Sequence, residues 1–116
     1  MILSNGSKVL VVHRRLFADD QTRYFIGTVL GYENGIAKVK GHTYIKDSLN
    51  GEFVERRDDR IKIFSIASGT LIVYELPADL LLDTVTLLVG SAGSICLTDG
   101  SEFSMDLTEI THKSSE

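Results

Sequence analysis

Turn-forming dipeptides divide this chain into short segments and limit its fold more than any other sequence feature. Asn34-Gly35, Asn50-Gly51 and Asp99-Gly100 each supply the positive φ values that a two-residue hairpin turn requires. Between the turns, short apolar runs alternate with polar residues, whereas the helical signal is confined to 77–82, where a proline suits a first helical turn. The sequence therefore predicts an all-β protein built from hairpins, with one short helical turn.

Nine segments have the composition and spacing of strands. The expected strands are 8–13, 24–32, 36–46, 52–55, 61–66, 70–76, 84–89, 94–98 and 102–107. We interpret the charged run 56–60 as an exposed connection between two of them. No internal repeat, low-complexity segment or linker divides the chain, so we expect a single β domain over 1–110 and a flexible tail over 111–116.

Length and composition fit one packed domain without membrane attachment. A chain of 116 residues of which 43% are hydrophobic and 24% charged is able to bury a core of its own. Its longest apolar runs, at 9–12 and 80–82, are far shorter than the roughly 20 residues that span a bilayer. The first residues also lack the charged start and apolar stretch of a signal peptide. We therefore expect a cytoplasmic protein.

Charge is distributed unevenly along the chain. Residues 1–62 hold 11 Lys/Arg against 8 Asp/Glu, a net charge of +3, whereas 63–116 hold 1 Lys against 8 Asp/Glu, a net charge of −7. This division fits an anionic partner for the first half. The alternative, which we favour, is that the two halves neutralise each other within one domain.

The Asn34-Gly35 turn also sets the pairing of the two strands that it joins. Counting outward from this turn, Leu30 faces Val39, and their side of the ribbon is nearly all apolar, so we predict that it faces the core. The next hairpin places Lys46 opposite Glu55 by the same rule. The other side of the first ribbon is predicted to face solvent and carries Phe25, Lys38, Lys40, His42 and Tyr44.

The stretch from Lys8 to Gly41 resembles a known fold. A first strand over 8–12 is followed by a polar loop over 15–23 and then by a tight hairpin. This arrangement resembles the opening of an SH3-like barrel of the Tudor or KOW type. The resemblance implies a small barrel or sandwich, with the strands after residue 70 as an extension, and a binding module as the functional class.

The candidate binding residues combine cations with aromatic rings. Nucleic-acid surfaces use this combination, because cations contact phosphates while rings stack on bases. The predicted ligand site comprises Phe25, Lys38, Lys40, His42 and Tyr44 together with Arg14, Arg15 and Arg23. The alternative is that Phe25 and Tyr44 cover a second small core while the lysines form a solvated face.

Patterns typical of catalysis and of metal sites are absent from the sequence. His13, His42 and His112 lack ligand spacing, and the single Cys96 excludes the common zinc motifs. A nucleophile elbow and a phosphate-binding glycine loop are also missing. We expect no metal, cofactor or catalytic residue, and a binding module for a protein or a nucleic acid. The alternative is a homo-oligomeric scaffold that assembles through β-edges, and an enzyme whose site is not visible in the sequence comes third.

Overall fold

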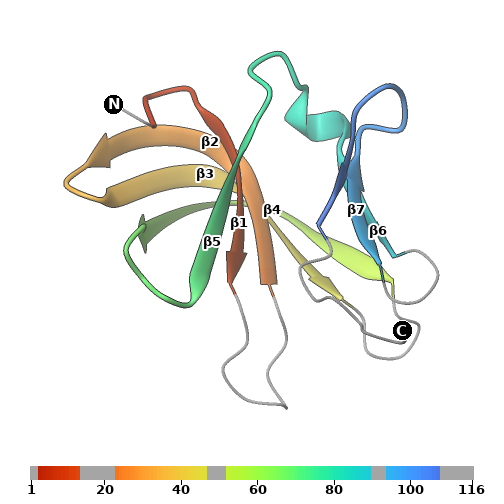
Figure 1. Cartoon of the computed structure of the whole chain (residues 1–116), viewed down its shortest axis with the longest axis horizontal. Coiled ribbons are helices and arrows are strands. Elements are labelled where there is room, and N and C mark those ends of the chain that lie inside the picture. Colours follow the sequence, from red (N-terminus) through yellow and green to blue (C-terminus); the bar gives the residue numbers. More distant parts are fainter. Residues whose placement is uncertain (1–2, 14–22, 47–51, 90–93, 108–116) are drawn as a thin grey trace, which may run out of the picture.

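The computed structural model describes residues 3–13, 23–46, 52–89 and 94–107. The strands of these ranges form two antiparallel sheets, one with the order β4-β3-β2-β1-β5 and one with the order β6-β7-β8 (Figure 1), which confirms the all-β prediction. The elements are β1 (Lys8–His13), β2 (Arg23–Glu33), β3 (Ile36–Lys46), β4 (Phe53–Ser65), β5 (Leu71–Leu76), η1 (Leu82–Thr84), β6 (Thr86–Val89), β7 (Ile95–Thr98) and β8 (Ser104–Asp106). Within the described ranges, no helix has the length and apolarity needed to cross a membrane.

β4 differs most from the sequence prediction. It runs continuously through 56–60, so the interpretation of this charged run as a connection was wrong. A strand at the edge of a sheet tolerates charged side chains, because only one of its sides is paired. The predicted pair of Lys46 with Glu55 was also wrong, since Lys46 faces Phe53 and Glu55 faces Tyr44.

Of the two predicted hairpin turns that lie within the described residues, one forms as predicted and the other does not. Asn34 and Gly35 have φ values of 52° and 77° and form the predicted two-residue turn. Asp99 and Gly100 instead begin a longer loop, in which the Asp99 carboxylate accepts hydrogen bonds from the backbone N–H groups of Ser101 and Phe103. The helical turn expected over 77–82 is a 3-10 turn, η1, that starts at Leu82. The Asn50-Gly51 turn and the tail 111–116 lie outside the described residues.

A β-bulge at Leu30 changes the register of the first hairpin. The predicted pairing holds from the turn as far as Gly31 and Lys38. Beyond them Val29, and not Leu30, faces Val39, because one extra residue on β2 shifts every following pair by one. The predicted pairing of Leu30 with Val39 was therefore wrong, and Leu30 is 42% exposed.

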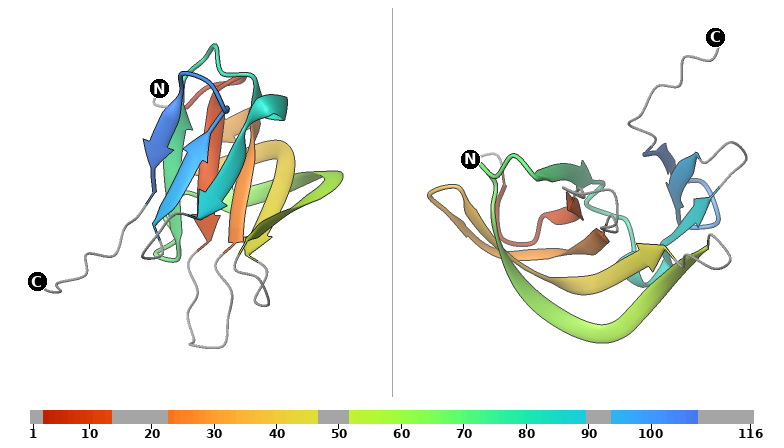
Figure 2. Two further views of the ribbon diagram at one scale, coloured as in Figure 1. Left: turned by 90° about the vertical axis from the view of Figure 1, so that its right-hand side faces the viewer. Right: turned by 90° about the horizontal axis from the view of Figure 1, so that it is seen from below.

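The five-stranded sheet curls strongly, with β4 as its long outermost arc (Figure 2). A cluster of buried residues lies on each of its faces. We call the side of the sheet that carries Val9, Phe25 and Val39 the inner face. Its buried residues are Leu3, Val9, Val11, Phe25, Val29, Ala37 and Val39. The other side, which we call the outer face, packs against the three-stranded sheet through a second group of buried residues. These are Leu10, Val12, Tyr24, Ile26, Tyr44, Leu76, Leu80, Val85, Leu87, Leu97 and Leu107.

The three-stranded sheet covers only part of the outer face. We call the part beneath it, around Leu10, Tyr24, Ile26 and Tyr44, the covered half. The remaining part, which we call the open half, is formed by alternate residues of β3 and β4. Its residues are Ile36, Lys38, Lys40, Ile61 and Ile63, and all five are exposed.

The pair Gly27 and Gly41 lies at the border between the covered and the open half. β2 and β3 approach each other closely here. A Cβ on Gly27 would overlap the backbone carbonyl of Lys40, and a Cβ on Gly41 would overlap that of Ile26. Only glycine allows this approach of the two backbones.

Candidate functional site

The predicted basic-aromatic face does not form. Phe25 and Tyr44 are each only 3% exposed, and they lie on opposite faces of the sheet. The Phe25 ring contacts the Phe64 ring in the inner core, whereas the Tyr44 hydroxyl donates to the backbone carbonyl of Val85 beneath the three-stranded sheet. The bulge is the physical reason, because its extra residue moves Tyr44 from a position opposite Phe25 to one opposite Tyr24.

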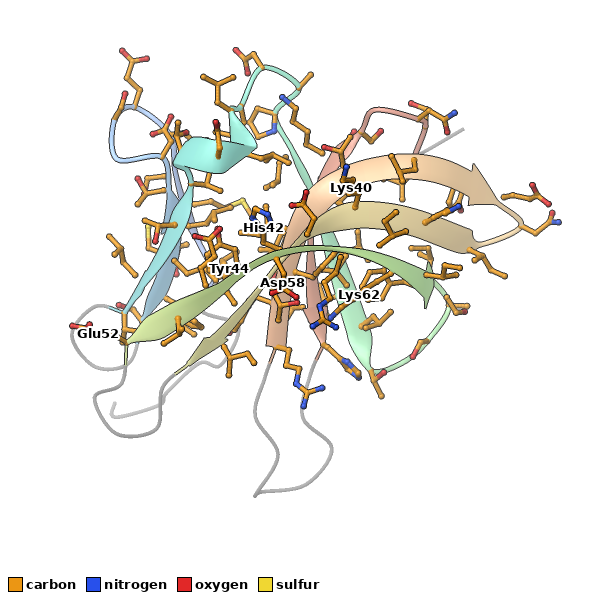
Figure 3. The ribbon with its side chains drawn as sticks, turned by 180° about the vertical axis from the view of Figure 1, so that it is seen from behind. Lys40, His42, Tyr44, Glu52, Asp58 and Lys62 are labelled. Carbon is orange, nitrogen blue, oxygen red and sulfur yellow. The ribbon has the colours of Figure 1, made fainter. Side chains whose placement is uncertain are left out.

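Lys38 and Lys40 lie where the sequence predicts them, on an exposed face. On β4, Ile63 faces Lys38 and Ile61 faces Lys40, so these side chains form a mixed cationic and apolar surface. Lys40, His42 and Tyr44 follow one another along β3 towards the three-stranded sheet (Figure 3). The three positions thus pass from solvent to the covered core within five residues.

His42 lies in an irregular part of the β3–β4 ladder and contacts two carboxylates. It stands between the pairs Gly41↔Arg60 and Thr43↔Arg56, where β4 carries two more residues than β3. Its Nδ1 lies 3.0 Å from Glu55 Oε2 and its Nε2 lies 2.6 Å from Asp59 Oδ1. Contacts at both ring nitrogens orient the imidazole and tie β3 to β4.

A cavity of about 260 Å³ lies beside His42, between β3 and η1. Its lining is mixed, with Lys40, Asp59 and Asp83 next to the apolar Ile26 and Leu82. The carboxylate of Asp59 already contacts His42. Because Ile26 belongs to the covered half and Lys40 to the open half, this cavity lies at the junction between them.

Arg23 lies apart from the two exposed lysines, on the inner face. It lines a concavity of about 210 Å³ together with Thr43, Ile45, Arg60 and Lys62, which we call the cationic concavity. Burial, followed by repulsion from Arg23 and Arg60, lowers the pKa of Lys62 below its ordinary value. The Lys62 ammonium also lies 4.8 Å from the centroid of the Phe25 ring, a cation–π contact.

Ile61 and Ile63 are functional candidates that the sequence reasoning missed. They are 54% and 68% exposed, although isoleucine is usually buried. The signal was present in the alternation of cations and isoleucines over 60–63. It indicates a strand with two different sides, but the charged run before it had been assigned to a connection.

The predicted site residues are thus only partly brought together. Lys38, Lys40 and His42 share the outer face of β3, Arg23 lies on the inner face, and Arg14 and Arg15 fall outside the described residues. In the described part of the chain, no group of three or more His, Cys, Asp or Glu side chains is placed to hold a metal ion.

Comparisons with known proteins assign no family to the chain. Neither the protein-family models, nor the curated proteins, nor the solved structures contain a match.

Proposed function

We propose that this protein is a binding module that takes up an extended segment of another protein as an additional strand beside β4. The observation that carries the proposal is the edge strand itself, which pairs with β3 on one side and exposes Ile61 and Ile63. An edge strand directs alternate N–H and C=O groups away from its sheet. A segment of about six residues, about 20 Å long, is sufficient to pair with residues 60–65.

The side chains at this edge support a protein ligand over a nucleic acid. Nonspecific single-strand binding relies on aromatic rings that stack on bases, and both rings of the predicted face are buried. Ile61 and Ile63 instead offer aliphatic surface beside a row of backbone groups. Strand addition uses this combination, with backbone hydrogen bonds for affinity and alternate side chains for specificity.

The SH3-like barrel predicted from residues 8–41 is part of the same proposal. The order β4-β3-β2-β1-β5, in which β5 returns to pair with β1, supports a barrel over 8–76. Residues 77–107 would then be an extension that supports the outer face. A fold of this kind serves many binding functions and names no ligand by itself. The cytoplasmic location predicted from the sequence belongs to the same proposal.

The β4 edge also favours a second candidate function, a homo-oligomer formed by pairing of β4 strands. In an antiparallel pair centred on Lys62, each Ile61 faces an Ile63 of the other copy, which buries apolar surface. The same register places the two Lys62 side chains opposite each other, and like charges in that position are destabilising. We therefore rank a separate partner above a second copy.

Binding of a synthetic strand tests the proposed function. The probe is a fluorescein-labelled octapeptide of alternating isoleucine and serine, and the control peptide carries an N-methyl group on every residue, which removes the backbone hydrogen-bond donors from both of its edges. We expect fluorescence anisotropy to rise with the first peptide only. Ile63→Lys should weaken binding at least about tenfold, because it removes apolar contact at the edge.

Leu88→Lys is the matched control variant for this experiment. Leu88 is 52% exposed and lies on β6 of the other sheet, so its replacement should leave peptide binding unchanged. Equal binding of both peptides, or full binding by Ile63→Lys, would contradict strand addition at β4. A concentration-dependent dimer in sedimentation, lost in Ile63→Lys, would favour the second candidate instead.

A further inference from the structure

The two sides of β4 present different chemistry to a strand that pairs beside it. Ile61 and Ile63 lie on the outer face opposite Lys40 and Lys38, whereas Lys62 lies on the inner face opposite Val39. In a sheet, directly opposite residues on neighbouring strands point to the same face. An added strand would therefore meet isoleucines with one set of its side chains and cations with the other set.

The inner side of the β4 edge leads into the cationic concavity. Its lining residues run from Arg23 on β2, through Thr43 and Ile45 on β3, to Arg60 and Lys62 on β4. The described lining thus holds three cations and no carboxylate.

One carboxylate beside the concavity offsets part of this charge. The Arg60 guanidinium donates to Asp58 Oδ2 through Nε at 2.9 Å and also lies 2.9 Å from it through Nη2. This pair is more than half exposed, so its attraction is screened by solvent. Burial, and after it repulsion from Arg23 and Arg60, lowers the pKa of Lys62, so the three cations lie close enough to repel one another.

We infer that the strand taken up beside β4 is a segment of alternating acidic and apolar residues, whose acidic side chains enter the cationic concavity. This inference rests on the proposed function and specifies its ligand. Arg60 contacts Asp58 through Nε and Nη2, and a guanidinium has five N–H donors, so Arg60 has further donors for a second carboxylate, while Thr43 adds a hydroxyl group to the lining. A carboxylate placed there also relieves the repulsion among Arg23, Arg60 and Lys62. The apolar side chains of the segment lie against Ile61 and Ile63.

Three labelled octapeptides test the inference: isoleucine alternating with glutamate, with serine and with lysine. We expect the glutamate peptide to bind about five- to twentyfold more tightly than the serine peptide at low salt, through one or two ion pairs. The lysine peptide should bind most weakly. Raising the salt concentration to about 0.5 M should remove most of the difference between the glutamate and serine peptides.

Two charge-neutralising variants separate the concavity from the general charge of the protein. Arg60→Gln should lower the affinity for the glutamate peptide about fivefold and leave that for the serine peptide unchanged. Lys38→Gln is the matched control, since it removes one cation from the outer face near the same edge and should preserve the preference for glutamate.

The outcomes distinguish the inference from the proposed function. If none of the three peptides binds, strand addition itself is wrong. If the serine and glutamate peptides bind equally, or Lys38→Gln removes the preference as fully as Arg60→Gln does, strand addition stands and the acidic specificity is wrong. If a single-stranded oligonucleotide binds more tightly than the glutamate peptide and loses its affinity in Arg60→Gln, the concavity serves phosphates and the inference is overturned.

Discussion

The covered and the open half of the outer face belong to one sheet, yet one is buried and the other is exposed to solvent. Tyr24, Ile26 and Leu10 in the covered half are buried against the three-stranded sheet, whereas Ile61 and Ile63 in the open half are exposed. Both halves carry large apolar side chains, so the difference lies in what packs on them. The comparison shows that apolar side chains on the outer face of this sheet are buried only where residues 77–107 pack on them.

A close approach of two backbones marks the border between the two halves. Gly27 and Gly41 bring β2 and β3 into close approach there, and η1 lies over the cavity beside them. His42, with its two carboxylate contacts, stands on the same boundary. The border between the buried and the exposed half of the outer face thus coincides with a close approach of β2 and β3.

The largest contrast in stability is expected between truncating an apolar side chain that packs onto the covered half and truncating one in the open half. Leu97, from the three-stranded sheet, is 0% exposed, and we expect Leu97→Ala to lower the free energy of unfolding by about 2–5 kcal/mol through loss of burial and formation of a cavity. Ile63→Ala in the open half should change it by no more than about 0.5 kcal/mol. Urea denaturation monitored by tyrosine fluorescence measures both. Similar losses in the two variants would break the distinction between the halves.

A methyl group at the border should have the next largest effect. Gly41→Ala forces a Cβ against the backbone of Ile26, and we expect a loss of about 1–3 kcal/mol or more, because a carbonyl group cannot rotate away as a side chain can. Gly31→Ala is the control, since a Cβ there meets nothing within 4 Å. Its effect on the midpoint of urea denaturation should be small, and an equally large loss at Gly31 would show that the close approach is not decisive.

The smallest effect on stability is expected from removing one polar atom that is buried in the covered half. The Tyr74 hydroxyl is a buried group without a hydrogen-bond partner among the described residues, and its ring packs against the outer core. Tyr74→Phe removes this unsatisfied group, so the free energy of unfolding should stay the same or rise by up to about 1 kcal/mol. A clear loss of stability in thermal unfolding would show that the hydroxyl is bonded after all.

Much of the fold was predictable from the sequence because turns and alternation are local signals. The positive φ values at Asn34 and Gly35 and the expected strands of both sheets follow from residues adjacent in the chain. The continuity of β4 was not predictable in this way. Charged residues over 56–60 are compatible with a connection or with an edge strand, and the choice depends on whether another strand lies beside them.

The candidate site was less predictable than the fold for a related reason. Phe25 and Tyr44 were assigned to one surface by counting from the turn, and a single extra residue at Leu30 separated them. The alternative, that these rings cover a second core, is closer to the structure, since each belongs to a core on its own face. Gly31 next to Leu30 is compatible with a bulge, but Gly27 in the same strand is regularly paired, so glycine alone did not indicate where the extra residue lies.

The bulge at Leu30 lets β2 hold one extra residue while the residue pairs on both sides of it stay regular. Leu30 is the one residue of β2 without an opposite residue on β3, and every pair on either side of it is regular. A chain that lacked Leu30 would keep the same residue pairs between β2 and β3, and its side chains would still alternate between the two faces of the sheet. Conversely, an insertion or deletion elsewhere in β2 would exchange interior and exterior for all positions beyond it. Length variation in this hairpin is therefore tolerable at one point, and sequence comparison should allow a gap there.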